Sequence, residues 1–147
     1  MRTVFDINRQ LYLPESEAIT DNFRLYEVAD KLEPVSFIDM TFMVEMVEPL
    51  RQAVNRPFFV NSGCRTKATN TRVGGHPRSL HLMFNPDHKY VNGCLALDIK
   101  CDHWDNQTKG VFVKNAKQLG LSIGFGSTFF HIDARVLISM PRAEFNY

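Results

Sequence analysis

Hydrophobic residues recur at three- and four-residue steps between residues 36 and 55, and this period predicts an amphipathic helix. Asp39 and Thr41 are suited to capping its start. Pro49 should kink or divide the helix, because proline has no backbone N–H and crowds the preceding turn. The apolar stripe, rich in Met and Phe, is best explained as a core-facing surface.

Runs in which apolar and polar residues alternate predict strands. In the strand expected at 94–101, Leu97 and Ile99 would face one side of a sheet and Asp98 the other. The remaining expected elements are a short helix at 22–30, a strand at 56–63, a helix at 106–120 and strands at 122–126 and 129–138. This order predicts an α+β fold with helices packed on one side of a mainly antiparallel sheet.

Length and composition are those of one soluble globular domain. The chain has 147 residues, 44% of them hydrophobic, so we expect a single domain over 1–147. Within it, 1–35 is an N-terminal extension of unassigned role, and 36–140 carry the motifs. The net charge is +1 and the basic residues are scattered, so the sequence shows no basic segment typical of nucleic-acid binding. Since no signal-peptide core or membrane-span run is visible, we expect synthesis in a cytoplasm without membrane insertion.

Asp98 is a carboxylate inside an apolar strand, where an unpaired charge would be very costly. His81 and His131 could join it around one metal ion. Two imidazoles and one carboxylate leave a fourth position open, which is the usual layout of a catalytic zinc site. Asp133 would share a strand face with His131, and could act there as a general base or orient His131. By spacing alone, core histidines that make ordinary hydrogen bonds are the commoner explanation.

Five short motifs occur in order along the second half of the chain. They are "SGCRT" (62–66), "NTRVGG" (70–75), "SLH" (79–81), "GCLALDI" (93–99) and "FFHIDAR" (129–135). With these motifs, the chain from Val60 onwards resembles the zinc D-Ala-D-Ala carboxypeptidase family of peptidoglycan peptidases. The resemblance implies a hedgehog/D-Ala-D-Ala peptidase-like fold, related to the lysostaphin-like zinc peptidases.

The resemblance also implies roles for individual residues. One Zn²⁺ would be bound by His81, Asp98 and His131. Arg65 would face the substrate, where a guanidinium can hold a peptide carboxylate or a developing oxyanion. Ser79 would support His81 by hydrogen bonding.

The chain departs from the family pattern at several positions. Asp98 follows His81 by seventeen positions, more than in relatives. The extra residues form an insertion at 84–92 that we expect to be a flap or rim of the cleft. Cys64 replaces the usual tyrosine. Thr128 stands where many relatives have an acid, three residues before the last histidine. Asp133 is therefore left as the candidate base.

The resemblance implies zinc-dependent hydrolysis of an amide bond in the peptide stem or cross-link of bacterial peptidoglycan, by a D-Ala-D-Ala carboxypeptidase or endopeptidase. Small relatives without a signal peptide are often phage lysis enzymes or virion-associated peptidases, so other virion proteins are expected partners. An alternative is a zinc-containing binding or structural virion module without turnover. A third reading is a cysteine hydrolase using Cys64, although the three cysteines are best explained as buried thiols.

Overall fold

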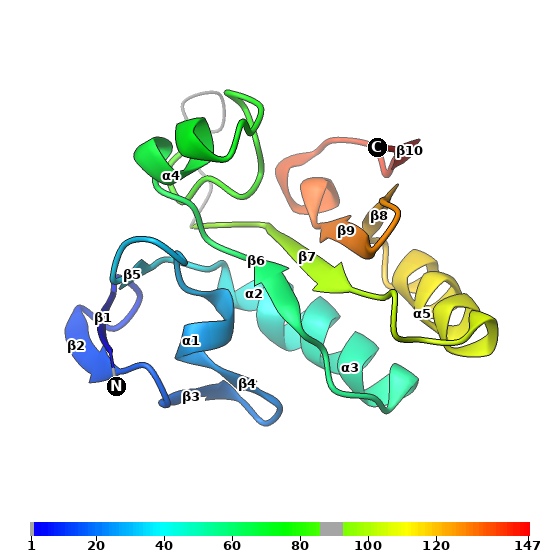
Figure 1. Ribbon diagram of the computed structural model, residues 1–147, viewed down its shortest axis with the longest axis horizontal. Coiled ribbons are helices and arrows are strands. Elements are labelled where there is room, and N and C mark those ends of the chain that lie inside the picture. The colour runs from blue at the N-terminus through cyan, green and yellow to red at the C-terminus, as the bar shows by residue number, and fades with distance from the viewer. Residues whose placement is uncertain (1, 86–92) are drawn as a thin grey trace.

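A five-stranded sheet forms the centre of the computed structural model (Figure 1). Its order is β10-β8-β9-β7-β6, and every neighbouring pair is antiparallel except β10 and β8. The strands are β6 (Val60–Ser62), β7 (Ala96–Lys100), β8 (Ser122–Phe125), β9 (Phe129–Asp133) and β10 (Glu144–Asn146). The predicted mainly antiparallel sheet is confirmed. The structure describes residues 2–85 and 93–147, so most of the insertion predicted at 84–92 lies outside the described residues.

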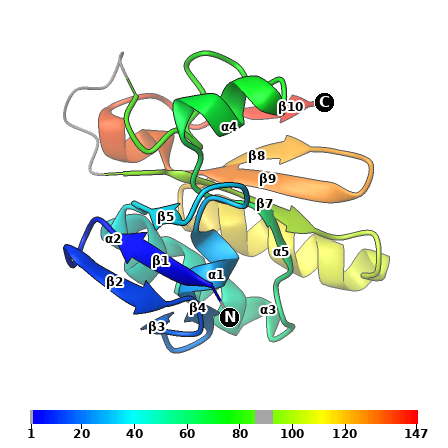
Figure 2. The same cartoon turned by 60° about the vertical axis from the view of Figure 1, so that its left-hand side comes forward.

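Two helices cover one face of this sheet and close the main core. α3 (Glu48–Val54) packs against α5 (Asn106–Gln118), and α5 packs against β8. Leu97 and Ile132 are fully buried in this core. Figure 2 shows α3 and α5 on one side of the sheet and α4 (Lys67–Arg72) on the other. The predicted one-sided packing therefore holds for the long helices, whereas the short α4 lies on the opposite side of the sheet.

The helix predicted over 36–55 is divided next to Pro49. It begins as α2 (Met40–Phe42), where the carboxylate of Asp39 accepts a hydrogen bond of 2.9 Å from a backbone N–H of the first turn. The segment Met43–Val47 is π-helical, and Pro49 lies in the first turn of α3. Because proline has no backbone N–H to donate, the hydrogen-bond pattern of the helix changes from α to π just before it.

Among the helices of residues 2–85 and 93–147, none has the length and apolar character of a membrane span.

The N-terminal part of the chain forms two small sheets. One has the order β2-β1-β5 and the other pairs β3 with β4. Their strands, and the one helix between them, are β1 (Thr3–Asp6), β2 (Leu11–Pro14), β3 (Ala18–Thr20), β4 (Phe23–Arg24), α1 (Leu25–Val28) and β5 (Val35–Ser36). The helix predicted at 22–30 is thus limited to α1, since its first residues belong to β4.

A buried carboxylate joins this N-terminal part to the rest of the domain. Asp30 has no exposed surface, and it accepts hydrogen bonds from the Thr66 N–H at 2.8 Å and the Thr69 hydroxyl at 3.0 Å. Gly63 lies so close to this part that a Cβ there would be 2.5 Å from the Val28 carbonyl oxygen. The N-terminal residues therefore support the loop that leads from β6 into α4.

The strand predicted at 129–138 is shorter than expected. β9 ends at Asp133, and Arg135–Ile138 forms a 3-10 turn. The Asp133 carboxylate accepts the backbone N–H of Arg135 at 3.1 Å, which closes the chain into a turn. The chain then returns as β10, a strand that the sequence did not predict.

Candidate metal centre

The register of β7 and β9 brings two of the predicted ligands together. Asp98 and His131 are direct partners across this antiparallel pair, so both side chains project from the same face. The Oδ1 atom of Asp98 lies 3.0 Å from Nδ1 of His131. The alternation that buries Leu97 and Ile132 therefore sends Asp98 and His131 to the opposite face, as the sequence predicted for Asp98.

His81 reaches this pair from a loop. The backbone N–H of Arg65 donates to the His81 carbonyl oxygen at 2.8 Å, and this bond fixes the loop beside β6. The ring places Nδ1 2.8 Å from the Gly63 carbonyl oxygen and Nε2 3.2 Å from Asp98 Oδ1. Donation from Nδ1–H to the carbonyl leaves the Nε2 lone pair directed at the cluster.

The three side chains fit a single metal ion. Each of His81, Asp98 and His131 offers one ligand atom, and these three atoms lie within 4.8 Å of one another. In residues 2–85 and 93–147 this is the one group of three or more His, Cys, Asp or Glu side chains that could hold a metal ion. Tetrahedral zinc with bonds of about 2.1 Å separates its ligand atoms by about 3.4 Å. The 3.0 and 3.2 Å contacts of Asp98 with the two rings are close to that spacing, so the donor set suits zinc with one open position.

Burial and hydrogen bonding set the protonation of these groups. Burial opposes ionisation of Asp98, but the imidazole rings of His131 and His81 beside it hold its pKa well below the usual range. Burial lowers the pKa of His81. Burial also acts against the charged form of His131, yet hydrogen bonds to Asp133 and Asp98 raise its pKa above the ordinary value. These shifts favour the metal-binding forms of Asp98 and His81, whereas the shift at His131 favours its protonated form, which competes with metal binding.

Asp133 lies behind His131, away from the predicted ion. Its Oδ2 is 2.8 Å from Nε2 of His131, which leaves Nδ1 of that ring for the ion. Arg135 donates to both carboxylate oxygens, at 2.9 and 2.8 Å. Burial would raise the pKa of Asp133, but the hydrogen bonds from Arg135 and His131 hold it well below the usual range. The arrangement fixes the tautomer and the orientation of His131.

Arg65 and Ser79 both lie beside the ligand cluster. The Nη2 atom of Arg65 is 3.5 Å from Asp98 Oδ2, and two further guanidinium nitrogens donate to side-chain oxygens at 3.0 and 3.2 Å. Ser79 Oγ accepts the backbone N–H of His81 at 3.2 Å. The Arg65 guanidinium is therefore fixed by hydrogen bonds beside the site, and Ser79 stabilises the loop that carries His81.

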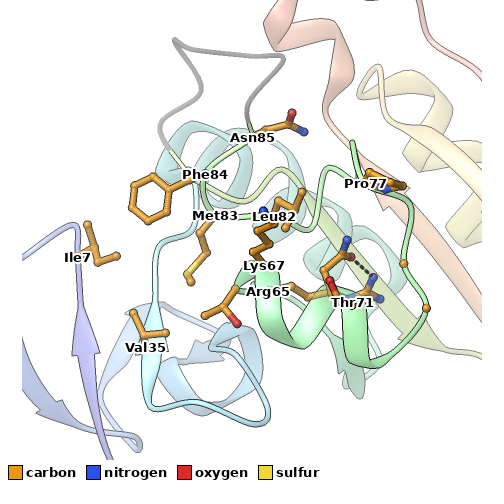
Figure 3. Close-up of a pocket in the computed structure, with 14 residues that line it drawn as sticks. Ile7, Val35, Arg65, Lys67, Thr71, Pro77, Leu82, Met83, Phe84 and Asn85 are labelled. Carbon is orange, nitrogen blue, oxygen red and sulfur yellow. Dashed lines mark hydrogen bonds between the residues drawn. The ribbon is translucent and has the colours of Figure 1, made fainter.

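The ligand cluster lines a cleft of about 810 Å³. A second cavity of about 980 Å³ adjoins α4, and Figure 3 shows its lining, which includes Leu82, Met83 and Phe84. Arg65 and Gly75 line both spaces, but none of the three candidate ligands lines the second one. We therefore assign the chemistry to the cleft and not to the larger, more apolar cavity.

Aromatic side chains near the C-terminus form a wall of the cleft that the sequence did not predict. Phe129, Phe145 and Tyr147 all line it. Phe145 lies in β10, which pairs with β8. The alternation in "EFNY" is the available signal, and it spans too few residues to identify a strand.

The cysteines lie away from the ligand cluster. All three are free and buried, as predicted. The sulfur of Cys64 is 3.8 Å from the hydroxyl of Ser36, and Cys64 does not line the cleft. Its position therefore gives no support to a cysteine nucleophile.

Comparison with known proteins places the chain in a family. A search of curated proteins finds no match. The family model described as Peptidase M15 matches residues 18–133, which is most of the chain and includes His81, Asp98 and His131. The match begins within the predicted N-terminal extension 1–35, so part of that segment belongs to the family's domain. The resemblance is confirmed, and the chain belongs to the Peptidase M15 family, the zinc D-Ala-D-Ala carboxypeptidase family.

Proposed function

We propose that the protein hydrolyses an amide bond in the peptide stem or cross-link of bacterial peptidoglycan with the help of one zinc ion. The observation that carries this proposal is the convergence of ligand atoms from His81, Asp98 and His131 in the cleft. Membership of a metallopeptidase family supports it. The finer assignment, a D-Ala-D-Ala carboxypeptidase or endopeptidase, is proposed from the resemblance to that family.

The ligands are arranged to bind the ion without rearrangement of the protein. His81 would contribute Nε2, Asp98 an oxygen and His131 Nδ1. When bound, zinc supplies an activated water near neutral pH and polarises the scissile carbonyl. The Gly63 carbonyl and the Asp133 carboxylate hold the opposite nitrogens of the two rings, each at 2.8 Å. These contacts orient both rings, so that Nε2 of His81 and Nδ1 of His131 face the predicted ion, and the positions of the ligand atoms are preorganised.

Arg65 is suited to bind the negatively charged part of the substrate. Its side chain is only 13% exposed, and its Nη2 faces Asp98 at 3.5 Å, longer than a strong hydrogen bond. The guanidinium is therefore oriented by its neighbours, and it can still donate hydrogen bonds to an anionic group of the substrate. We assign it to a peptide carboxylate or to the developing oxyanion of the tetrahedral intermediate.

We assign Asp133 to orienting His131, the second of the two roles that the sequence left open. A general base needs an oxygen within hydrogen-bond reach of the proton that it takes. Both Asp133 oxygens are already hydrogen-bonded, to His131 and Arg135, and the residue has no exposed surface. This geometry favours a positioning role over proton transfer.

The biological setting is proposed from the resemblance alone. Relatives of this size are often bacteriophage lysis enzymes or virion-associated wall peptidases. We propose the same setting here, with the peptidoglycan stem as substrate and other virion proteins as partners.

The test is incubation of the purified protein with defined muropeptides. Mass spectrometry should detect released D-Ala or split cross-links, and this product should disappear with a chelator and return with added zinc. The Asp98→Ala variant is the matched negative control. Bound zinc without product at several pH values would contradict the enzyme proposal and support the alternative of a zinc-containing structural module.

A further inference from the structure

One row of residues runs across the cleft face of the central sheet and continues into the C-terminal strand. Asp98 pairs with His131, His131 with Gly124, and Gly124 with Phe145. Direct partners in neighbouring strands project from the same face. Figure 1 shows β10 at the edge of the sheet beside β8. The family match ends at Asp133, so the segment that completes this row lies beyond the matched residues.

A glycine in this row allows two aromatic rings to approach the metal ligands. A Cβ at Gly124 would lie 2.5 Å from a ring atom of Phe145 and 2.7 Å from one of Tyr147. Because Gly124 has no Cβ, the rings can come close to His131. The centroid of the His131 ring lies 5.5 Å from that of Phe145 and 6.2 Å from that of Tyr147. The C-terminal residues therefore form a wall directly beside a candidate zinc ligand.

Tyr147 combines a supported ring with an available hydroxyl. Its ring packs 5.0 Å from Phe129 and 5.7 Å from Phe145, while 69% of the residue remains exposed. An ordinary phenol has a pKa of about 10 and is protonated at neutral pH, so this hydroxyl can donate a hydrogen bond. Within the described part of the chain, no hydrogen bond engages it.

We propose that Tyr147 is a substrate-binding residue whose hydroxyl donates a hydrogen bond to a peptide carbonyl of the substrate in the cleft. This inference rests on the proposed function. Arg65 and Arg135 also line the cleft, and their guanidinium groups suit carboxylates. A neutral phenol beside an apolar aromatic wall suits an uncharged amide, which is what the backbone on either side of a scissile bond presents.

The Tyr147→Phe variant tests this assignment because it removes the hydroxyl and keeps the ring. Loss of one neutral hydrogen bond should raise KM about three- to tenfold, with kcat, zinc content and melting temperature unchanged. Tyr12→Phe is the matched control, since Tyr12 lies in β2 and is similarly exposed, at 73%; its KM should equal that of the wild type. An unchanged KM in Tyr147→Phe would overturn the proposal, as would a fall in kcat alone.

Gly124→Ala is an independent variant that displaces the wall without removing an aromatic residue. The new methyl group should push the rings of Phe145 and Tyr147 away, so we expect KM to rise by more than in Tyr147→Phe while one zinc per chain is retained. Wild-type KM in this variant, with the protein folded, would contradict the proposal.

A binding measurement separates this inference from the proposed function. A synthetic stem peptide is titrated calorimetrically into zinc-loaded wild type and Tyr147→Phe. If the wild type cleaves no muropeptide, the proposed function fails, but a three- to tenfold weaker affinity in the variant would still support Tyr147 as a peptide-binding residue. Equal affinities, or no binding to the wild type, would overturn it.

Discussion

The two faces of the β7–β9 pair consist of alternate residues of the same strands but are held by different interactions. Leu97 and Ile132 are fully buried among apolar side chains, and such burial stabilises a fold by about 1.5–3 kcal/mol per side chain. Asp98 and His131, on the other face, are held by directional hydrogen bonds. The two-residue period of a strand thus assigns stability to one face and chemistry to the other.

This comparison predicts that the two faces can be damaged separately. Substitutions on the helix-covered face should lower the free energy of unfolding and spare the metal site. Substitutions on the cleft face should abolish or weaken metal binding and leave the core intact.

The largest effect is expected on the cleft face. Asp98→Ala should reduce zinc from about one per chain to background, because Asp98 is the proposed carboxylate ligand and contacts both imidazoles. The measurement is elemental analysis after dialysis against buffer treated with chelating resin. Asp102→Ala is the control, since that exposed carboxylate lies outside the cluster. Full zinc content in Asp98→Ala would remove Asp98 from the ligand set.

On the opposite face, Leu97→Ala should cost about 2–5 kcal/mol of unfolding free energy, through lost burial and the cavity that remains. Urea unfolding of the metal-free protein, followed by circular dichroism, measures this cost. The folded variant should still bind one zinc per chain. A folded Leu97→Ala protein without zinc would show that the two faces are not independent.

Asp133→Asn should weaken zinc binding about 10–100-fold, since the carboxylate orients His131 from the side opposite the ion. Competition with a chromogenic chelator measures the affinity. Asp102→Asn provides the control at an exposed carboxylate. Unchanged affinity together with a large fall in kcat would instead support Asp133 as the general base.

Zinc affinity should fall as the pH is lowered through the raised pKa of His131, by up to about tenfold per pH unit, because the ion must displace one proton from that ring. The group gains its proton as the pH falls, so affinity is highest above this pKa. Chelator competition from about pH 8 to pH 6 follows the effect. In Asp133→Asn the fall should begin at lower pH, since a hydrogen bond that raises the pKa is weakened; a fall at the same pH would contradict this origin.

The smallest effect is expected for Cys64→Ser. Cys64 is buried and does not line the cleft, so muropeptide turnover should match that of the wild type in steady-state assays. Loss of turnover in a folded, zinc-loaded Cys64→Ser protein, or activity that resists chelators, would support a cysteine hydrolase instead.

The candidate site was more predictable from the sequence than the fold around it. His81, Asp98 and His131 lie in short motifs, and strand alternation predicts that Asp98 points away from the face of Leu97, while the register of β7 and β9 is what pairs it with His131. The N-terminal strands span only two to four residues, too few for an alternating pattern to be distinguished. Their placement depends on contacts with distant parts of the chain, such as those of Asp30.

The C-terminal region shows a different reason for failure. Apolar residues continue past Asp133 and favour a long strand, but hydrogen bonds from Arg135 to the Asp133 carboxylate turn the chain. Side-chain bonding of this kind competes with strand pairing and leaves no periodic signal. The choice that we propose between the two roles left open for Asp133 likewise depends on which atoms its oxygens contact.

The most direct test is the metal content of wild-type protein purified without added metal and then equilibrated with a slight excess of zinc. We expect about one tightly bound zinc per chain, with the ring nitrogens Nε2 of His81 and Nδ1 of His131 perturbed in NMR spectra of the loaded protein. A folded wild-type protein that binds no zinc, or that binds it without perturbing these two rings, would contradict the account.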